Sequence, residues 1–184
     1  MDDSSGSVKF RLGTEEDAYT SFLIFERALS DLLHRMGSKT STGVSDPEKL
    51  ARMWEERQPL YLHLTRTADQ FWIAESDGRP AGYARSIVRG SLRELTELFV
   101  LPGLQSAGIG RELIRRAFPE VGSDLRVIIA TTDFRAQALY LRAGVYPRFS
   151  LYYFGKEPQP RSASSDLRFK PMAEVSHYLQ IVAR

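Results

Sequence analysis

Two spacings of apolar residues recur along the chain, and each predicts a different element. Alternation of apolar and polar positions is typical of a strand, whereas apolar residues three and four apart are typical of an amphipathic helix. The predicted strands are 8–12, 71–75, 80–88, 92–100, 125–132, 146–154 and 167–171. The predicted helices are 15–34, 47–57, 110–118 and 134–142, with a further apolar stretch at 60–64. This order predicts an α+β (α/β-like) fold, with a mixed, mostly antiparallel sheet of about six or seven strands and helices on both faces.

Two local signals support these boundaries. Thr14, followed three residues later by Asp17, is typical of a helix start, where a carboxylate stabilises the free N–H groups. Asp77-Gly78 lies between two alternating segments and predicts a tight hairpin.

The segment 95–118, LTELFVLPGLQSAGIGRELIRRAF, joins a strand to a helix through a glycine-containing turn. Glycines at 108 and 110 allow the backbone to approach a phosphate, and the first N–H groups of a helix attract anions. An ordinary strand-turn-helix connection would also use glycine here, so the short motif alone leaves both interpretations open. A P-loop is excluded because Gly110 is followed by Arg111, and the dinucleotide fingerprint is excluded because its third glycine position is Leu113.

The spacing Gln105-x-x-Gly108-x-Gly110 after a Leu-x-Val strand resembles the GNAT superfamily of N-acetyltransferases. A second stretch, DFRAQALYLRAGV, resembles the other signature of that family. Its matching positions are Asp133, Ala136, Leu139, Tyr140 and Gly144. The resemblance covers roughly residues 8–172. It implies a GNAT fold and transfer of an acetyl group from acetyl-CoA to an amine, directly and through a ternary complex.

The resemblance also implies where acetyl-CoA binds. The end of the strand would hold the thioester, and the glycine turn would hold the pyrophosphate, mostly through backbone N–H groups. The implied cofactor-binding residues are Leu98, Phe99, Val100, Gln105, Ser106, Ala107, Gly108, Ile109, Gly110, Arg111, Asp133 and Ala136. Asp133 replaces the usual Asn, and because a carboxylate repels phosphates, capping of the next helix is the favoured role for it. Ala107 stands where most members carry a basic residue or glycine, and Val145 replaces an aromatic residue.

The catalytic residues implied are Tyr140, Glu97 and Glu94. Tyr140 would donate a proton to the departing sulfur; the alternative is a tyrosine packed in the core. Either glutamate could accept the amine proton, directly or through water, or be an ordinary solvated strand carboxylate. They are three residues apart and face opposite sides of an ideal strand, so only one can face the cleft unless a bulge intervenes. Glu97 lies closer to the expected acetyl position.

Composition narrows the class of protein. The 184 residues suit one domain, and a net charge of +2 does not indicate binding to nucleic acid or to a membrane surface. The absence of cysteine excludes disulfides, thiolate metal sites and a cysteine acyl-enzyme, and three scattered histidines give no reason to expect a metal. No apolar run approaches the length of a membrane span. We therefore expect a cytoplasmic protein. The resemblance implies an enzyme with an amine acceptor, either a small molecule or a peptide or protein, and a homodimer is left open.

The two ends of the chain are expected to differ from its centre. Residues 1–7 are polar and predicted to be disordered, whereas residues 8–156 form the catalytic core. Residues 157–184 combine a Pro/Ser-rich linker with a closing strand and a C-terminal helix. The alternative is that this segment begins a second GNAT repeat, because it echoes the first strand and helix. The alternative function is then a non-catalytic CoA-binding or sensor module, or half of a tandem protein.

Overall fold

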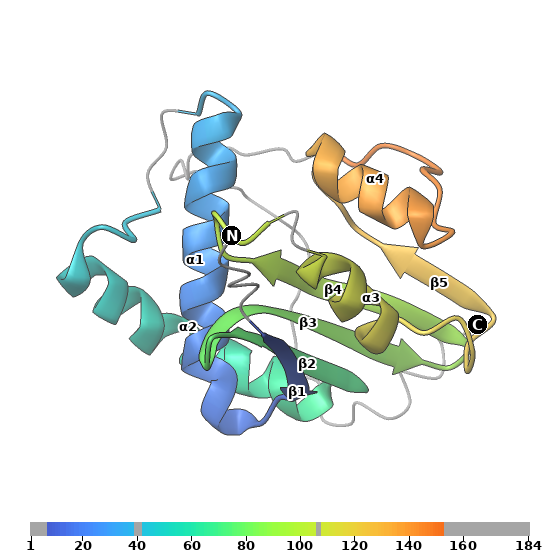
Figure 1. Cartoon of the computed structure of the whole chain (residues 1–184), viewed down its shortest axis with the longest axis horizontal. Coiled ribbons are helices and arrows are strands. Elements are labelled where there is room, and N and C mark those ends of the chain that lie inside the picture. Colours follow the sequence, from blue (N-terminus) through green and yellow to red (C-terminus); the bar gives the residue numbers. More distant parts are fainter. Residues whose placement is uncertain (1–6, 39–41, 106–107, 153–184) are drawn as a thin grey trace, which may run out of the picture. The chain divides into compact units, whose positions relative to one another are not determined.

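The structure is a computed structural model that describes residues 7–38, 42–105 and 108–152. The chain divides into two compact units, Met1–Arg148 and Phe149–Arg184, and the helices and strands of the described residues lie in the first (Figure 1). The elements are β1 (Val8–Leu12), the 3-10 helix η1 (Glu15–Asp17), α1 (Ala18–Arg35), α2 (Pro47–Thr67), β2 (Gln70–Ser76), β3 (Arg79–Arg89), β4 (Leu92–Val100), α3 (Ile109–Ala117), β5 (Leu125–Ile128) and α4 (Phe134–Arg142).

The strands form one sheet in the order β1-β2-β3-β4-β5. The first four strands are antiparallel neighbours, whereas β5 runs parallel to β4. A parallel neighbour requires a crossover connection, and α3 supplies it. The mixed, mostly antiparallel sheet is therefore confirmed.

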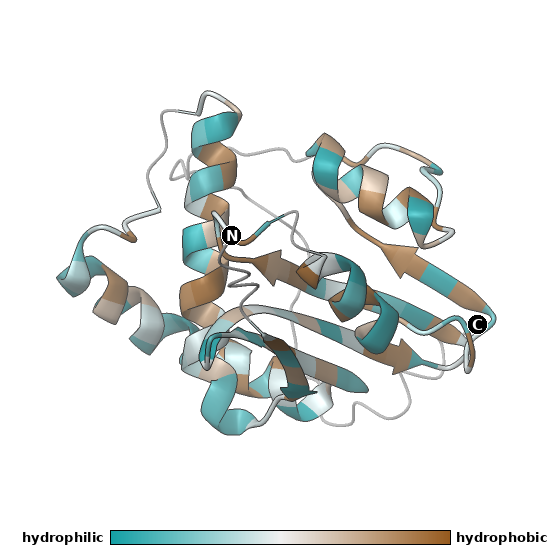
Figure 2. Ribbon diagram, viewed as in Figure 1, coloured by the Kyte–Doolittle hydropathy of each residue, from teal (hydrophilic) through white to brown (hydrophobic). Residues whose placement is uncertain are grey.

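Helices cover both faces of this sheet, as predicted. Alternate residues of β3 point to opposite faces, so Ala84 packs in a cluster with Leu113 of α3, while Tyr83 packs in a second cluster with Ile24 of α1. Figure 1 shows α3 lying across β3 and β4, and Figure 2 shows that α3 carries both apolar and polar residues. The amphipathic helix buries its apolar side on the sheet.

The spacing between β4 and β5 positions the functional site. Their pairing ends at Leu95 and Ile128, and β4 then continues to Val100 without a partner on that side among the described residues. The same stretch contains a bulge, because β3 pairs Arg85 with Glu97 but Ser86 with Leu95. A bulge bends its strand and increases the local twist. The two parallel strands therefore separate at their carboxyl ends.

Two local predictions are confirmed. The Asp17 carboxylate accepts a hydrogen bond from the Thr14 N–H at 2.9 Å, so it satisfies a free donor at the first helix start. In the β2–β3 hairpin, Asp77 and Gly78 have φ angles of 51° and 72°, as tight hairpin turns require.

Three predictions about elements are wrong in part. The second helix does not end near residue 57: α2 continues through Pro59 to Thr67, because packing of buried Tyr61 outweighs the preference of proline against helix interiors. The predicted strand 125–132 ends at Ile128, where its pairing with β4 stops. Residues 146–152 form no strand, since an alternating pattern needs a paired neighbour and none of the described strands provides one. The described sheet accordingly has five strands rather than six or seven; the predicted strand 167–171 lies outside the described residues, as do residues 1–6.

Candidate functional site

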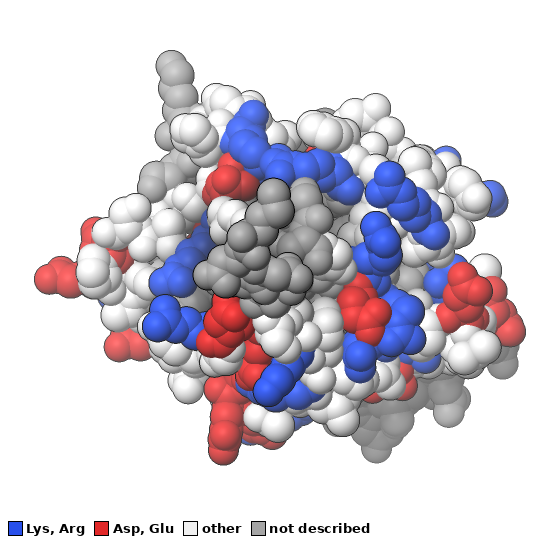
Figure 3. Space-filling view, viewed as in Figure 1, with Lys and Arg blue, Asp and Glu red and all other residues white. Residues whose placement is uncertain are grey.

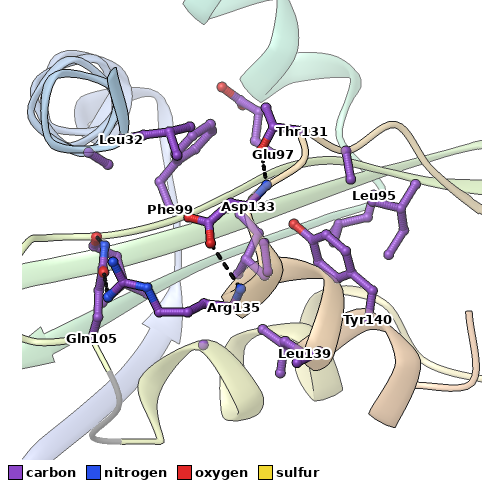
Figure 4. A pocket seen from close by; sticks show the side chains of 18 of the residues that line it. Leu32, Leu95, Glu97, Phe99, Gln105, Thr131, Asp133, Arg135, Leu139 and Tyr140 are labelled. Atoms are coloured by element: carbon purple, nitrogen blue, oxygen red, sulfur yellow. Dashed lines mark hydrogen bonds between the residues drawn. The ribbon is translucent and has the colours of Figure 1, made fainter. Parts of the chain in front are cut away.

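A cavity of about 530 Å³ lies where β4 and β5 separate. Figure 4 shows that it is enclosed by the end of β4, the start of α3, the segment 129–131, and the helices α1 and α4. The lining residues are Ala28, Leu32, Arg35, Leu95, Thr96, Glu97, Leu98, Phe99, Val100, Gln105, Gly108, Gly110, Arg111, Ile128, Ile129, Ala130, Thr131, Asp133, Phe134, Arg135, Ala136, Ala138, Leu139, Tyr140 and Arg142. The two signatures recognised in the sequence thus line one cavity.

The start of α3 presents backbone N–H groups at this cavity. Gly108 is the N-cap and has a φ of +82°, a left-handed conformation that favours glycine. Apart from its neighbours in the chain, none of the described residues has an atom within 4 Å of the position that a Cβ on Gly108 would occupy, so this side of the turn is open toward them. A Cβ on Gly110 would approach Leu139 of α4 at 3.3 Å, so this glycine allows α3 and α4 to pack closely. The N–H groups of the first helical turn lack intrahelical partners and favour an anion.

Gln105 connects the end of β4 to α4. Its side-chain amide donates to the Val100 carbonyl at 3.1 Å, and its side-chain oxygen accepts from Arg135 at 3.1 Å. The side chain is therefore engaged within the protein, and it fixes the turn relative to α4.

Asp133 caps α4, the role favoured for it from the sequence. Its carboxylate accepts from the Arg135 N–H and from the Arg35 guanidinium, both at 2.9 Å. Partial burial acts to raise the pKa of Asp133, but these donors outweigh it and hold the pKa below its ordinary value. Arg35, which also pairs with Asp31, ties the last turn of α1 to α4 across the cavity and compensates the negative charge.

Four arginines line the cavity: Arg35, Arg111, Arg135 and Arg142. Figure 3 shows Lys and Arg side chains gathered between α1 and α4 on this face. Among the described residues, Arg111 and Arg142 make no ion pair. The cavity is thus suited to a ligand with several negative charges.

Tyr140 directs its hydroxyl into the cavity (Figure 4). Among the described residues no group accepts from this hydroxyl or donates to it. Burial, together with the charge of Asp133, raises the pKa of Tyr140 to about 12. The phenol therefore keeps its proton at neutral pH and can donate it to a group inside the cavity.

The bulge in β4 places the two candidate glutamates on the same face of the sheet. Glu97 lies opposite Arg85 and Glu94 opposite Ile87, and these two β3 residues are two apart. Glu97 lines the cavity, and both its oxygens accept hydrogen bonds, from Arg85 at 2.6 Å and Tyr83 at 2.8 Å. Glu94 does not line the cavity.

The remaining sequence-predicted residues fall into three groups. Leu98, Phe99, Val100, Arg111 and Ala136 line the cavity. The side chain of Ile109 is buried in the core, so only its backbone can contact a ligand. Ser106 and Ala107 lie outside the described residues.

The sequence analysis missed Arg85, Tyr83 and Arg135. An arginine inside the apolar strand segment AGYARSIV was a signal that a buried ion pair exists. It did not identify the partner, because the register between β3 and β4 depends on the bulge.

Within the described ranges, no three His, Asp or Glu residues lie close enough together to hold a metal ion. None of the helices formed by the described residues is both long and apolar enough to cross a bilayer.

Comparison with known proteins identifies the family. The model of the Acetyltransferase (GNAT) family matches residues 32–145, whereas a comparison with curated proteins found no significant match. Among solved structures, a GCN5-related N-acetyltransferase from Ralstonia eutropha JMP134 has a TM-score of 0.57 and 22% identity, over 80% of this chain and 97% of that chain. The aminoglycoside acetyltransferase HMB0005 from an uncultured soil metagenomic sample has a TM-score of 0.55 and 16% identity, over 82% and 99%. The aminoglycoside acetyltransferase meta-AAC0020 from such a sample, in complex with sisomicin, has a TM-score of 0.54 and 14% identity, over 82% and 97%. These structures share the fold, and because the family model spans more than half of the sequence, the chain belongs to the acetyltransferase (GNAT) family.

Proposed function

We propose that the protein is an N-acetyltransferase that moves the acetyl group of acetyl-CoA directly to an amine, with both substrates bound together. The observation that carries this proposal is a single cavity with three different chemical groups around it. These are the N-terminus of α3, the unpaired edge of β4 and the Tyr140 hydroxyl. Acetyl transfer needs an anion site, a donor to the acetyl oxygen and an acid for the leaving sulfur.

The residues present fit acetyl-CoA. The N–H groups at the start of α3 and the side chain of Arg111 suit its pyrophosphate, and the open space beside Gly108 lets a phosphate reach the backbone. Beyond Leu95, backbone N–H groups on the free edge of β4 face the gap to β5 and suit the acetyl oxygen. When bound, acetyl-CoA supplies an activated acetyl group as a thioester.

Tyr140 is the proposed acid. A phenol with a pKa of about 12 is fully protonated at neutral pH, so the proton is available when needed. Transfer to a thiolate, whose ordinary pKa is about 8.5, would be costly in water. The same burial that raises the pKa of Tyr140 also raises that of a thiol in the cavity, which reduces the mismatch.

Calorimetric titration with acetyl-CoA tests the cofactor, with desulfo-CoA and NADH as controls. We expect acetyl-CoA to bind and NADH to give no heat. A panel of amines is then screened by release of free thiol; it includes aminoglycosides, since two proteins of this fold are aminoglycoside acetyltransferases. Failure of acetyl-CoA to bind would contradict the proposal.

The variant Tyr140→Phe tests the acid. We expect kcat to fall about 100-fold, as general acid catalysis commonly contributes at least that much, with unchanged affinity for acetyl-CoA. The matched control is Tyr146→Phe, whose side chain is exposed and which we expect to behave as wild type. Equal turnover of wild type and Tyr140→Phe would rule out the acid role.

The second candidate is a CoA-binding module without catalysis. It is favoured by Glu97, because both oxygens of this carboxylate are engaged by Tyr83 and Arg85. Binding of acetyl-CoA without thiol release for every amine tested would support this alternative.

A further inference from the structure

We propose that Arg85 and Tyr83 are positioning residues that hold the Glu97 carboxylate as a fixed anion, and that this anion binds an acceptor arriving as an alkylammonium ion. The inference rests on the proposed acetyltransferase function and specifies its acceptor class. Glu97 would then attract and orient the amine, while the amine proton leaves to water.

Arg85 is held from several directions. It is fully buried, and one guanidinium nitrogen donates to Glu97 at 2.6 Å. The other donates to Thr65 of α2 at 3.0 Å and to Ser21 of α1 at 3.2 Å. The guanidinium also lies 4.1 Å from the centre of the Phe71 ring. An arginine with contacts to three elements and an aromatic face cannot follow a moving carboxylate, so it fixes the position of Glu97.

Tyr83 fixes the second oxygen of the carboxylate. It is fully buried two residues before Arg85, on the same face of β3, and its hydroxyl donates to Glu97 at 2.8 Å. With one donor for each oxygen, the carboxylate plane is set by β3 rather than by the bound acceptor.

The two members of the ion pair differ in their access to the cavity. The Arg85 side chain is 1% exposed and the Glu97 side chain 11% exposed, and only Glu97 lines the cavity. The pair is neutral as a whole, but its negative member belongs to the cavity wall, whereas its positive member contacts the helices α1 and α2. A cationic amine is attracted to the negative member, and little solvent screens the attraction.

The titratable groups of α1, α2 and α4 near Glu97 are either neutral or paired with an arginine. Tyr61 of α2 lies on the same side, and burial together with the charges of Glu97 and Glu26 raises its pKa, so it stays neutral. Glu26 pairs with Arg57. On the cavity side, Tyr140 is neutral and Asp133 is paired with Arg35. Arg85 is therefore the only described cation that pairs with Glu97.

Transfer of the acetyl group from the thioester to the ammonium releases one proton overall. The ammonium loses a proton to water, and the neutral nitrogen forms a bond to the acetyl carbon while the carbon–sulfur bond breaks. Tyr140 donates its proton to the departing sulfur. The nitrogen then gives up its second proton, and this proton restores the Tyr140 hydroxyl. An ammonium and a thioester thus give an amide, a thiol and one proton.

The test compares Tyr83→Phe and the double variant R85M/E97Q with wild type, using acetyl-CoA with benzylamine and sisomicin as probe amines. Tyr83→Phe keeps the buried ring and removes one hydrogen bond, so we expect the KM for the amine to rise about fivefold. R85M/E97Q removes both charges together, so that no buried charge is left unpaired, and we expect kcat/KM for the amine to fall about 100-fold. Calorimetric affinity for acetyl-CoA stays at the wild-type value in both. Wild-type kcat/KM in R85M/E97Q would overturn the inference.

A split between KM and kcat separates positioning from a structural role. In Arg85→Met the Glu97 carboxylate loses the group that holds it, so the KM for the amine rises while kcat per folded molecule changes little; Arg85→Lys restores the KM in part. A structural role would lower kcat per folded molecule and leave the amine KM unchanged, and that result would also overturn the inference. Arg57→Met is the control, since it breaks the neighbouring pair with Glu26 and leaves the amine KM unchanged. If wild type binds acetyl-CoA but acetylates neither amine nor any of the wider panel, the proposed function fails, and the inference fails with it.

Discussion

The two faces of the sheet are built by different physical means. Under α3 most of the buried residues are apolar: Ala74, Ala81, Ala84, Leu95, Ile109, Leu113, Ile114, Ala117 and Phe118. The buried Arg93 and Ser86 lie at the end of this face, where Arg93 pairs with Asp69 of the loop before β2. Under α1 and α2 the buried set includes Arg85, Ser21 and Glu26 beside aromatic rings. The α3 face depends mainly on the burial of apolar side chains, whereas the centre of the other face depends on charges that must be paired.

This difference affects what a mutation reports. On the α3 face, a loss of stability can be separated from a loss of activity more easily, because none of the fully buried side chains there is a proposed catalytic group, although Tyr140 packs against them. On the other face, Arg85 stabilises the fold and also holds Glu97 at the cavity. The stability of the fold and the catalytic activity are therefore coupled on this face. Only variants that remove both charges of a pair together can separate the two effects.

The largest expected effect comes from breaking the charged face. Arg85→Met leaves Glu97 partly buried without a cation, and we expect the free energy of unfolding to fall by about 3–5 kcal/mol, measured by urea denaturation. R85M/E97Q should recover most of this loss. The control Arg52→Met removes an exposed pair with Glu48 and should cost less than about 0.5 kcal/mol. Similar losses in Arg85→Met and Arg52→Met would abolish the distinction between the faces.

A smaller loss in the free energy of unfolding is expected when a buried side chain on the α3 face is truncated. Leu113 of α3 is fully buried, and Leu113→Ala should reduce the free energy of unfolding by about 3 kcal/mol through lost burial and the space left behind. The control is Leu60→Ala on exposed α2 surface, with an expected loss below about 1 kcal/mol. We expect thiol release per folded molecule to remain normal in Leu113→Ala, in contrast to the Arg85 variants.

The glycine turn allows a matched pair of substitutions. Gly108 and Gly78 both have positive φ, +82° and +72°, and neither has an atom within 4 Å of the position that a Cβ would occupy. Changing either to alanine should therefore cost a similar amount, about 1–2 kcal/mol. Only Gly108→Ala adds a methyl group at the cavity, so only it should weaken acetyl-CoA binding, by about tenfold or more in calorimetry. Equal acetyl-CoA affinity in the two variants would exclude the turn as the phosphate site.

The smallest effect concerns pH and the start of α1. Burial acts to raise the pKa of Asp17, but Arg11 and the Thr14 N–H outweigh it, so its pKa in the folded protein is below the ordinary value of 3.8. A lowered pKa stabilises the folded state above the unfolded pKa, and this contribution is lost as the pH falls through the folded one. Asp17→Asn should thus be less stable than wild type by about 1 kcal/mol at pH 7. Denaturation at decreasing pH should show the difference disappearing below about pH 4; a constant difference would contradict the assignment.

Features that depend on residues close together in the sequence could be predicted from it. The glycine turn, the Asp133 cap and the position of Tyr140 after it are set by spacing within single segments, and the structure places them around one cavity. The pairing of Arg85 with Glu97 was not predictable, because it depends on a one-residue irregularity between two strands. The continuation of α2 through Pro59 was missed for a similar reason, since tertiary packing outweighs local preference there.

The bulge at Thr96 has a consequence for mutational scanning. Thr96 is the extra residue between Leu95 and Glu97; it lines the cavity, and its side chain makes one hydrogen bond, to the Arg85 carbonyl at 3.2 Å. Substitutions that keep a small side chain at this position should therefore be tolerated, and a scan of such variants would score it as unimportant. Deletion is different: removing one residue keeps Glu97 opposite Arg85 but straightens β4, so that it can continue pairing with β5 and close the gap. At this position the length of the strand matters more than the identity of a small side chain, and only a scan that includes single-residue deletions can detect this.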